Sequence, residues 1–435
     1  MFKASSSTCR NTLDFLDDSD TIGHLAKISG FLKRKPRKIT PAGFVKAVIL
    51  AGAKDSISFN AIAWHAGQIG GATSSRQNLH RRCDENAVAF LQEVTAHALR
   101  QRCQMPPETG AFKRIIIHDG SIQHLADAVA KDFPAVSSTE HNKAMLRLQL
   151  SYDYLSGEVL YARLEPYPRT DARAAGDLIE HLQPGDLCLR DLGYYKAAWF
   201  QQMNALGAFY ISRLKSEVTV FTDSGSNLRL DKFLNRRKEA VVDQQVRLGG
   251  TGDFHTRLVA LRVPPEVAAQ RRRKLHAAAK RRHETVSALK LALADLTLLI
   301  TNLSKEQAGG EMLRQLYRLR WQVEIVFKTL KSNGCMRRLT SHVSNRHHLL
   351  ALLLGQLLQV ILNLRLCRVL SEFDPAHPPS LLKISGLTSE TLAALWLSER
   401  SESQWTRHIE RLNYHCRHDL RTLKNLEKLR AELLR

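Results

Sequence analysis

The sequence predicts an α/β fold in which a mixed β-sheet core lies between helical regions at both ends of the chain. Helical apolar periodicity fills the first hundred residues and the last ninety, whereas strand patterns are confined to the middle. The chain has 435 residues, of which 44% are hydrophobic and 24% charged, and these values are ordinary for a globular protein of two or three domains. We expect helical residues 1–108, an α/β core at 109–345 and helical residues 346–435.

Positive charge dominates the composition. Lys and Arg number 64 against 42 Asp and Glu, which gives a formal net charge of +22. A chain of this size with that excess favours a polyanionic partner, nucleic acid first and an anionic membrane second.

The most apolar run, 349–366, includes Gln356, Gln359, Asn363 and Arg365. These side chains are costly in lipid, so we expect a buried core helix and no membrane partner. Residues 1–20 lack the pattern of a signal peptide, and we expect a cytoplasmic protein.

The N-terminal helices include a candidate DNA-binding element. A basic run at 33–38 precedes an apolar helix at 44–53, and a second helix is predicted at 58–66, broken from Gly67 onward by Gly67, Gly70 and Gly71. Thr73 or Ser74 is placed to cap a third helix rich in Arg, Gln and Asn, whose side chains bond base edges and phosphates. Residues 58–83 therefore fit a helix-turn-helix with Arg76 and Arg81 as DNA contacts; the alternative is an ordinary polar surface helix.

The core begins after a boundary at Pro106, Pro107 and Gly110. Apolar residues 114–119 predict a buried strand, and 144–154 with 158–164 predict a hairpin. A helix at 172–182, a strand at 186–191, a helix at 195–205 and a strand at 208–214 follow. Three strands, helix, strand, helix, strand is the order of an RNase H-like core.

A β-rich insertion is expected at 216–303. It has strand patterns at 217–222, 241–248 and 257–263, and a closing apolar strand at 296–303. A strongly basic helix follows Pro264 and Pro265, and its crowded cations would repel one another without an anionic partner. We expect Arg272, Arg273 and Arg281 to contact DNA.

Three acidic residues stand in the order that a catalytic site of this fold needs. Asp119 and Asp191 follow predicted strands, and Glu324 lies in a predicted helix on which Tyr317, Arg320, Glu324 and Lys331 fall within about 60° of one another. Singly, an Asp at a strand end is more often a turn cap, and a Glu on a helix more often a salt-bridge partner. Together, three carboxylates are suited to hold two Mg²⁺ ions, with phosphoryl transfer as the chemistry.

The spacing Tyr317-x2-Arg320-x3-Glu324-x6-Lys331 resembles the Tyr-Arg-Glu-Lys signature of the insertion-sequence-four family of DDE transposases. Trp321, Phe327 and Lys328 are also similar to that family, as are the motifs beginning at Asp119 and Asp191. The resemblance covers roughly residues 110–335. It implies a cut-and-paste transposase whose metal ligands are Asp119, Asp191 and Glu324, with Mg²⁺ replaceable by Mn²⁺.

The resemblance also implies the partners. Tyr317, Arg320, Lys328 and Lys331 would contact DNA ends, the DNA would be the terminal inverted repeats and a target, and the protein would act as a homodimer at the bacterial nucleoid. Family members that form a DNA hairpin use an aromatic residue in the insertion, where this chain has no Trp but has Phe221, Phe233 and Phe254. Two alternatives are an RNase H-like nuclease that never joins DNA and a non-catalytic DNA-binding protein derived from a transposase.

Overall fold

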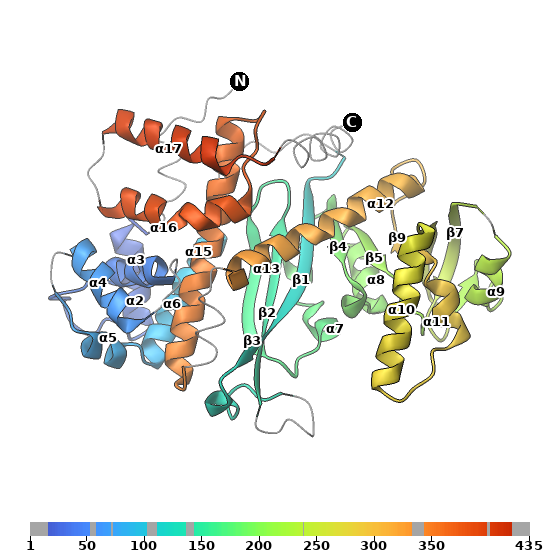
Figure 1. The fold of residues 1–435 in the computed structure, drawn as a ribbon, viewed down its shortest axis with the longest axis horizontal. Helices are drawn as coiled ribbons and strands as arrows, with labels where there is room; N and C mark the ends of the chain where they lie inside the picture. Colours follow the sequence, from blue (N-terminus) through green and yellow to red (C-terminus); the bar gives the residue numbers. More distant parts are fainter. Residues whose placement is uncertain are drawn as a thin grey trace. The chain divides into compact units, whose positions relative to one another are not determined.

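The computed structural model describes residues 16–52, 58–70, 73–101, 111–135, 143–237, 239–332, 343–397 and 401–419. The predicted boundary at Pro106, Pro107 and Gly110 lies outside these residues. The chain forms two compact units (Figure 1). The helical unit comprises Met1–Glu108, Gly120–Pro168 and Gln322–Arg435, and the sheet unit comprises Thr109–Asp119 and Arg169–Trp321.

The N-terminal helices of the helical unit are α2 (Ser19–Ile28), α3 (Pro41–Gly52), α4 (Phe59–Gly70), α5 (Arg76–Arg82) and α6 (Glu85–Arg100). The predicted end at Gly67 is wrong, because α4 continues to Gly70. The predicted cap of the third helix is one or two residues early, since the Ser75 side chain accepts the hydrogen bond from the Asn78 backbone N–H. Asp84 caps α6 in the same way.

Three long helices form the C-terminal part of this unit: α15 (Arg346–Phe373), α16 (Leu381–Leu397) and α17 (Glu402–Cys416). Helix α15 is long and apolar enough to cross a membrane, but 94% of its most apolar 18-residue window is buried inside the protein. One of its polar residues is satisfied there, since Arg365 donates to the backbone carbonyls of Ala98 and Gln101 at the end of α6. The predicted core helix is confirmed.

The helical unit also contains a hairpin of β2 (Ala144–Asp153) and β3 (Val159–Pro166), which pair antiparallel as predicted. The strand β1 (Arg114–Leu125) begins in the sheet unit and ends in this one, where the strand order is β3-β2-β1. A short 3-10 turn, η1 (Asp127–Val129), follows β1.

The sheet unit is built on strands in the order β1-β4-β5-β9-β8-β7-β6. Strands β1, β4 (Asp186–Arg190) and β5 (Phe209–Arg213) are parallel, whereas the others pair antiparallel. The antiparallel strands are β6 (Val220–Thr222), β7 (Val241–Leu248), β8 (Phe254–Arg262) and β9 (Leu296–Thr301). The mixed α/β fold is confirmed, and the structure adds that the insertion strands extend the core sheet through the β5–β9 pair.

Helices and turns connect these strands. They are α7 (Asp171–Ala174), η2 (Ile179–His181), η3 (Leu192–Tyr194), α8 (Ala197–Ala205), α9 (Leu230–Asn235), α10 (Pro265–Arg281), α11 (Ala288–Leu293), α12 (Gly310–Arg318) and η4 (Leu319–Trp321).

Two predicted helices differ from the observed ones. The expected helix at 172–182 is reduced to α7 and η2, because Gly176 lies against the Trp199 ring, where a Cβ atom would approach ring carbon to 2.7 Å. The single helical stripe expected from Tyr317 to Lys331 is wrong. The 3-10 turn η4 ends α12, and a separate helix α13 (Gln322–Ser332) follows in the helical unit, so the 3.6-residue phase is interrupted between Tyr317 and Glu324.

Candidate active site

Asp119 and Asp191 lie at the same edge of two adjacent parallel strands. Residues 114–118 of β1 pair in register with 186–190 of β4, so each Asp immediately follows the last paired residue, His118 and Arg190. Neighbouring strands lie about 4.8 Å apart, which brings the two residues side by side. Both are partly exposed, as a site that receives a ligand requires.

A separate side chain holds each of these carboxylates. Arg320 Nη1 lies 2.6 Å from Asp119 Oδ2, and the two side chains are only 8% and 14% exposed. The Tyr317 hydroxyl donates to Asp191 Oδ1 at 3.1 Å. Burial, and then the charge of Asp191, raise the pKa of Tyr317 well above its usual value, so the phenol remains a protonated donor at neutral pH.

The fold of the sheet unit explains why Tyr317 and Arg320 reach the two aspartates. Leu313, Leu316 and Leu319 are fully buried, and α12 packs against β5 and β8 while η4 contacts β4. The tighter 3-10 turn after Arg318 presents Arg320 inward, where it is 7% exposed, and leaves the next residue, Trp321, 61% exposed.

A buried Arg in the insertion fixes the start of α12. Arg257 on β8 pairs with Asp243 through two hydrogen bonds of 2.8 and 2.6 Å. Its Nη1 also donates to the carbonyls of Leu303, Ser304 and Ala308, which lie in the segment leading to α12. No local pattern in the sequence predicts the role of Arg257, because its partners are far from it along the chain.

The residues beside the aspartates face the other side of the sheet, as strand alternation requires. His118 is fully buried, with its ring 4.5 Å from the Tyr194 ring. Burial and then the charge of Arg190 lower the pKa of His118 well below its usual value, so His118 is a neutral packing residue. Arg190 is buried as well and donates to the Ala175 carbonyl at 2.7 Å.

Glu324, Lys328 and Lys331 lie on α13 in the helical unit, and all three are exposed. The opposite face of α13 is apolar, as predicted: Val323, Val326, Phe327 and Leu330 are buried, and the helix contacts α15 and α16. Lys331 Nζ lies 3.4 Å from the Ile122 carbonyl.

The donor set at the strand ends fits a hard divalent cation. Carboxylate oxygens are the ligands that Mg²⁺ prefers, and two of them lie side by side at the edge of the sheet unit. In the part of the chain that the structure describes, no group of three or more His, Cys, Asp and Glu side chains is gathered as a metal site.

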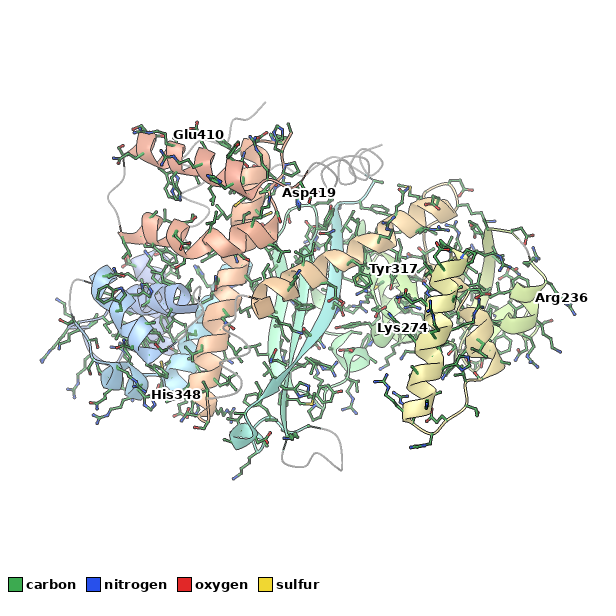
Figure 2. The ribbon with its side chains drawn as sticks, viewed as in Figure 1. Arg236, Lys274, Tyr317, His348, Glu410 and Asp419 are labelled. Atoms are coloured by element: carbon green, nitrogen blue, oxygen red, sulfur yellow. The ribbon has the colours of Figure 1, made fainter. Side chains whose placement is uncertain are left out.

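The predicted DNA contacts outside this site have different surroundings. Arg76 and Arg81 on α5 are exposed, as are Arg273 and Arg281 on α10; Lys274, beside Arg273, is labelled in Figure 2. Arg272 is instead ion-paired with Asp295, because α10 packs back toward the segment before β9.

The aromatic residues of the insertion are mostly packed. Phe254 is buried against Phe200 and Tyr210, so it is not available to hold a flipped base. Gly252 lies close to the Phe221 ring, where a Cβ atom would approach it to 3.1 Å. Phe233 is partly exposed, with the Arg237 guanidinium 5.1 Å from its ring centroid.

Comparison with known proteins shows that the chain is similar to transposases. The transposase for insertion sequence element IS231F of Bacillus thuringiensis subsp. israelensis is 29% identical over 347 residues, which cover 74% of this chain and 71% of that protein. The putative transposase InsL for insertion sequence element IS186A of Escherichia coli (strain K12) is 26% identical over 320 residues, or 71% of this chain and 80% of that one. A solved structure of the piggyBac transposase synaptic complex with hairpin DNA has a TM-score of 0.48 at 8% identity, covering 94% of this chain and 85% of that one.

The family model described as "Transposase DDE domain" matches residues 110–362. This segment contains Asp119, Asp191 and all of the residues from Tyr317 to Lys331. The chain belongs to the DDE-domain transposase family.

Proposed function

We propose that this protein is a DNA transposase that cleaves DNA at the ends of an insertion sequence and joins those ends to target DNA. The observation that carries the proposal is the pair of aspartates that follow the last paired residues of β1 and β4, each held by a member of the Tyr317-x2-Arg320 motif. Membership in the DDE-domain family supports the same chemistry. The finer assignment to the insertion-sequence-four group rests on the Tyr-Arg-Glu-Lys spacing.

Glu324 is proposed as the third carboxylate. It lies four residues after Arg320, whose guanidinium contacts Asp119. Its exposure on the first turn of α13 leaves the carboxylate accessible.

Asp119, Asp191 and Glu324 would hold two Mg²⁺ ions, or Mn²⁺. When bound, such ions activate a water or 3′-hydroxyl nucleophile and stabilise the leaving oxygen. Arg320 and Tyr317 orient the two aspartates through the hydrogen bonds described above. Arg320 also places a fixed positive charge where a DNA phosphate approaches.

The DNA partner is proposed to be the terminal inverted repeats of an element and a target duplex. Lys328 and Lys331 on α13 would contact the DNA end, with Arg76 and Arg81 on α5 and Arg273 and Arg281 on α10 contacting DNA further away. Arg272 is a weaker candidate because Asp295 already neutralises it. Two element ends must be brought together, so we propose a homodimer that acts on nucleoid DNA in the cytoplasm.

The test uses carboxamide variants on DNA that carries an element end. Asp191→Asn and Glu324→Gln should each lower cleavage by at least about 10²- to 10³-fold while retaining DNA binding, because they remove a charged ligand and preserve shape. Glu390→Gln, on the exposed surface of α16, is the matched control and should remain active.

Two outcomes would contradict the proposal. Full activity of Asp191→Asn in Mg²⁺ would remove the aspartate pair from the chemistry. Cleavage without any joined product, on precleaved ends supplied with target DNA, would identify a nuclease that lacks strand transfer.

A further inference from the structure

A basic pocket lies in the helical unit. It has a volume of about 380 Å³ and is formed where the loop after α2 meets the junction between α5 and α6. Its lining residues share this junction and include more cations than any other kind of side chain: residues 30–37, Arg82, Asp84 and Asn86. The cations among them are Lys33, Arg34, Lys35, Arg37 and Arg82.

Aromatic packing makes one wall of the basic pocket rigid. Phe31 is buried, with its ring centroid 4.8 Å from those of both Phe44 and Phe90. The Arg82 guanidinium lies over the Phe31 ring at 4.4 Å from its centroid. Burial is the main cause that lowers the pKa of Arg82, which shows that this cation is partly removed from water.

The loop that forms the other wall has a defined path. Gly30 adopts a φ of +74°, and a Cβ atom there would approach Asn86 Oδ1 to 2.9 Å, so only glycine fits without displacing Asn86. The Leu32 backbone N–H then donates to the Ala26 carbonyl at 2.8 Å. The basic residues that follow therefore start from a fixed point on α2 and α6.

The charge of the basic pocket is not balanced within the described residues. None of its five cations forms an ion pair with a carboxylate that the structure describes. The carboxylate in its lining, Asp84, is used to cap α6, where it accepts from the Ala87 backbone N–H at 3.0 Å. Five cations around one hollow, one of them partly desolvated, are stabilised by a bound polyanion.

We propose that the basic pocket binds the phosphate backbone of duplex DNA, beside the duplex groove that α5 enters. Arg82 is the last residue of α5, so the pocket adjoins the helix whose exposed Arg76 and Arg81 are the predicted DNA contacts. Phosphate contacts of this kind fix the register of a recognition helix without reading sequence. The cations lie both on the loop after α2 and at the end of α5. Several phosphates in succession along one DNA strand can contact both groups, whereas a single small anion contacts fewer of them. The inference rests on the proposed function only in taking DNA as the partner.

The test measures the salt dependence of DNA binding with the full chain. Lys33→Gln/Arg34→Gln removes two exposed cations from the pocket; Arg407→Gln/Arg411→Gln removes two exposed cations from α17 and is the matched control. Fluorescence anisotropy with a labelled duplex, between about 50 and 200 mM salt, gives the slope of log K against log salt. If both pocket cations contact phosphates, the slope should become shallower by about 1.8 in the pocket variant and stay unchanged in the control.

The pocket is proposed to contact the phosphate backbone, which is the same in every DNA sequence. The pocket variants should therefore lose the same affinity for element-end DNA as for an unrelated duplex. Arg76→Gln on α5 should instead reduce the preference for the element end. Lys35→Gln/Arg37→Gln serves as a second pocket variant, and thermal unfolding checks that each variant remains folded. A slope equal to that of the control in both pocket variants would overturn the proposal.

The same experiment separates this proposal from the proposed function. Asp191→Asn should retain the wild-type salt slope of DNA binding while losing cleavage. A failure of the pocket prediction would therefore not contradict the proposed catalytic function, and a failure of the proposed catalytic function would not contradict the pocket prediction. Binding of anionic lipid vesicles that is lost in the pocket variants, with the DNA slope unchanged, would assign the pocket to a membrane surface and overturn the DNA assignment.

Discussion

Each aspartate of the candidate site has a partner of the right kind to keep it in place. Two carboxylates at the ends of neighbouring strands repel each other, and Arg320 offsets that repulsion at Asp119 while the Tyr317 hydroxyl orients Asp191. The buried Arg320–Asp119 pair therefore has a structural role as well as the proposed role toward DNA.

Arg320→Gln should destabilise the protein by about 3 kcal/mol, because it leaves the mostly buried Asp119 carboxylate without its cation. Arg314→Gln on α12, the helix before η4, is the control: the side chains of its pair with Glu311 are 36% and 64% exposed, so the loss should be under about 1 kcal/mol. Urea unfolding of both variants measures the difference. Equal losses would show that the buried pair contributes no more to folding than the surface pair.

Between elements, one buried side chain connects the insertion to the helix that carries the site residues. Arg257 joins β7, β8 and the segment before α12 through five hydrogen bonds, and Gly310 at the start of α12 lies so close to Val241 that a Cβ atom would approach it to 2.5 Å. The insertion strands thus support the position of α12.

Arg257→Ala should lower the free energy of unfolding by about 3–5 kcal/mol, since Asp243 and three carbonyls lose their shared donor. Arg273→Ala, on the exposed face of α10, should change it by at most about 0.5 kcal/mol. Denaturant unfolding with matched m-values checks both. A small effect at Arg257 would mean that α12 is held by its apolar contacts alone.

A second contact between elements, between α15 and α5, predicts that the stability of the protein depends on pH. His348 on α15, labelled in Figure 2, packs with its ring 4.1 Å from that of His80 on α5, and its Nε2 lies 3.0 Å from the His80 carbonyl. Burial is the main cause that lowers the pKa of His348 below 6.5. The unfolded chain therefore binds a proton at a pH where the folded one does not, and His348 costs stability as pH falls below about 6.5.

We expect the melting temperature of His348→Gln to fall less between neutral pH and about pH 5.5 than that of the wild type. His24→Gln on α2 is a control at a surface histidine and should keep the wild-type pH dependence. Thermal unfolding at the two pH values measures this. A pH dependence identical to the wild type in His348→Gln would assign the acid sensitivity to other groups.

At the scale of the whole molecule, two features are suited to two different tasks: the net charge of +22 to DNA binding and the carboxylate site to catalysis. We propose that the excess of Lys and Arg serves DNA binding, which depends on salt, whereas Asp119, Asp191 and Glu324 serve the chemistry, which depends on the proposed metal ions. The two tasks should therefore respond separately to removal of metal.

Chelation by EDTA should abolish cleavage of element-end DNA while DNA affinity stays within about threefold, a difference of roughly 0.7 kcal/mol. Adding Mg²⁺ or Mn²⁺ should restore cleavage. Gel electrophoresis and anisotropy on the same samples measure both quantities. Full cleavage in excess EDTA would contradict the metal-dependent mechanism.

The sequence alone determined the class of fold and the chemical groups of the site. Hydrophobic periodicity is local, so it correctly predicted the strands at 186–191 and 241–248, the β2–β3 hairpin, the buried α15 and the apolar face of α13. The strand predicted at 114–119 begins where β1 does, but the predicted end at Asp119 is wrong, because β1 continues to Leu125. The acidic residues and the excess of positive charge are also properties of the sequence.

The tertiary structure decided which partners these groups take. Asp119 and Arg320 are 201 residues apart, and no local pattern records that they form an ion pair. The same holds for the β5–β9 pairing that makes the insertion part of the core sheet, for the close Gly176–Trp199 contact that shortens a predicted helix, and for Asp295, which neutralises Arg272. Residue patterns fix local conformation because it depends on neighbours in the chain, whereas long-range pairing depends on which surfaces remain to be buried once those elements pack.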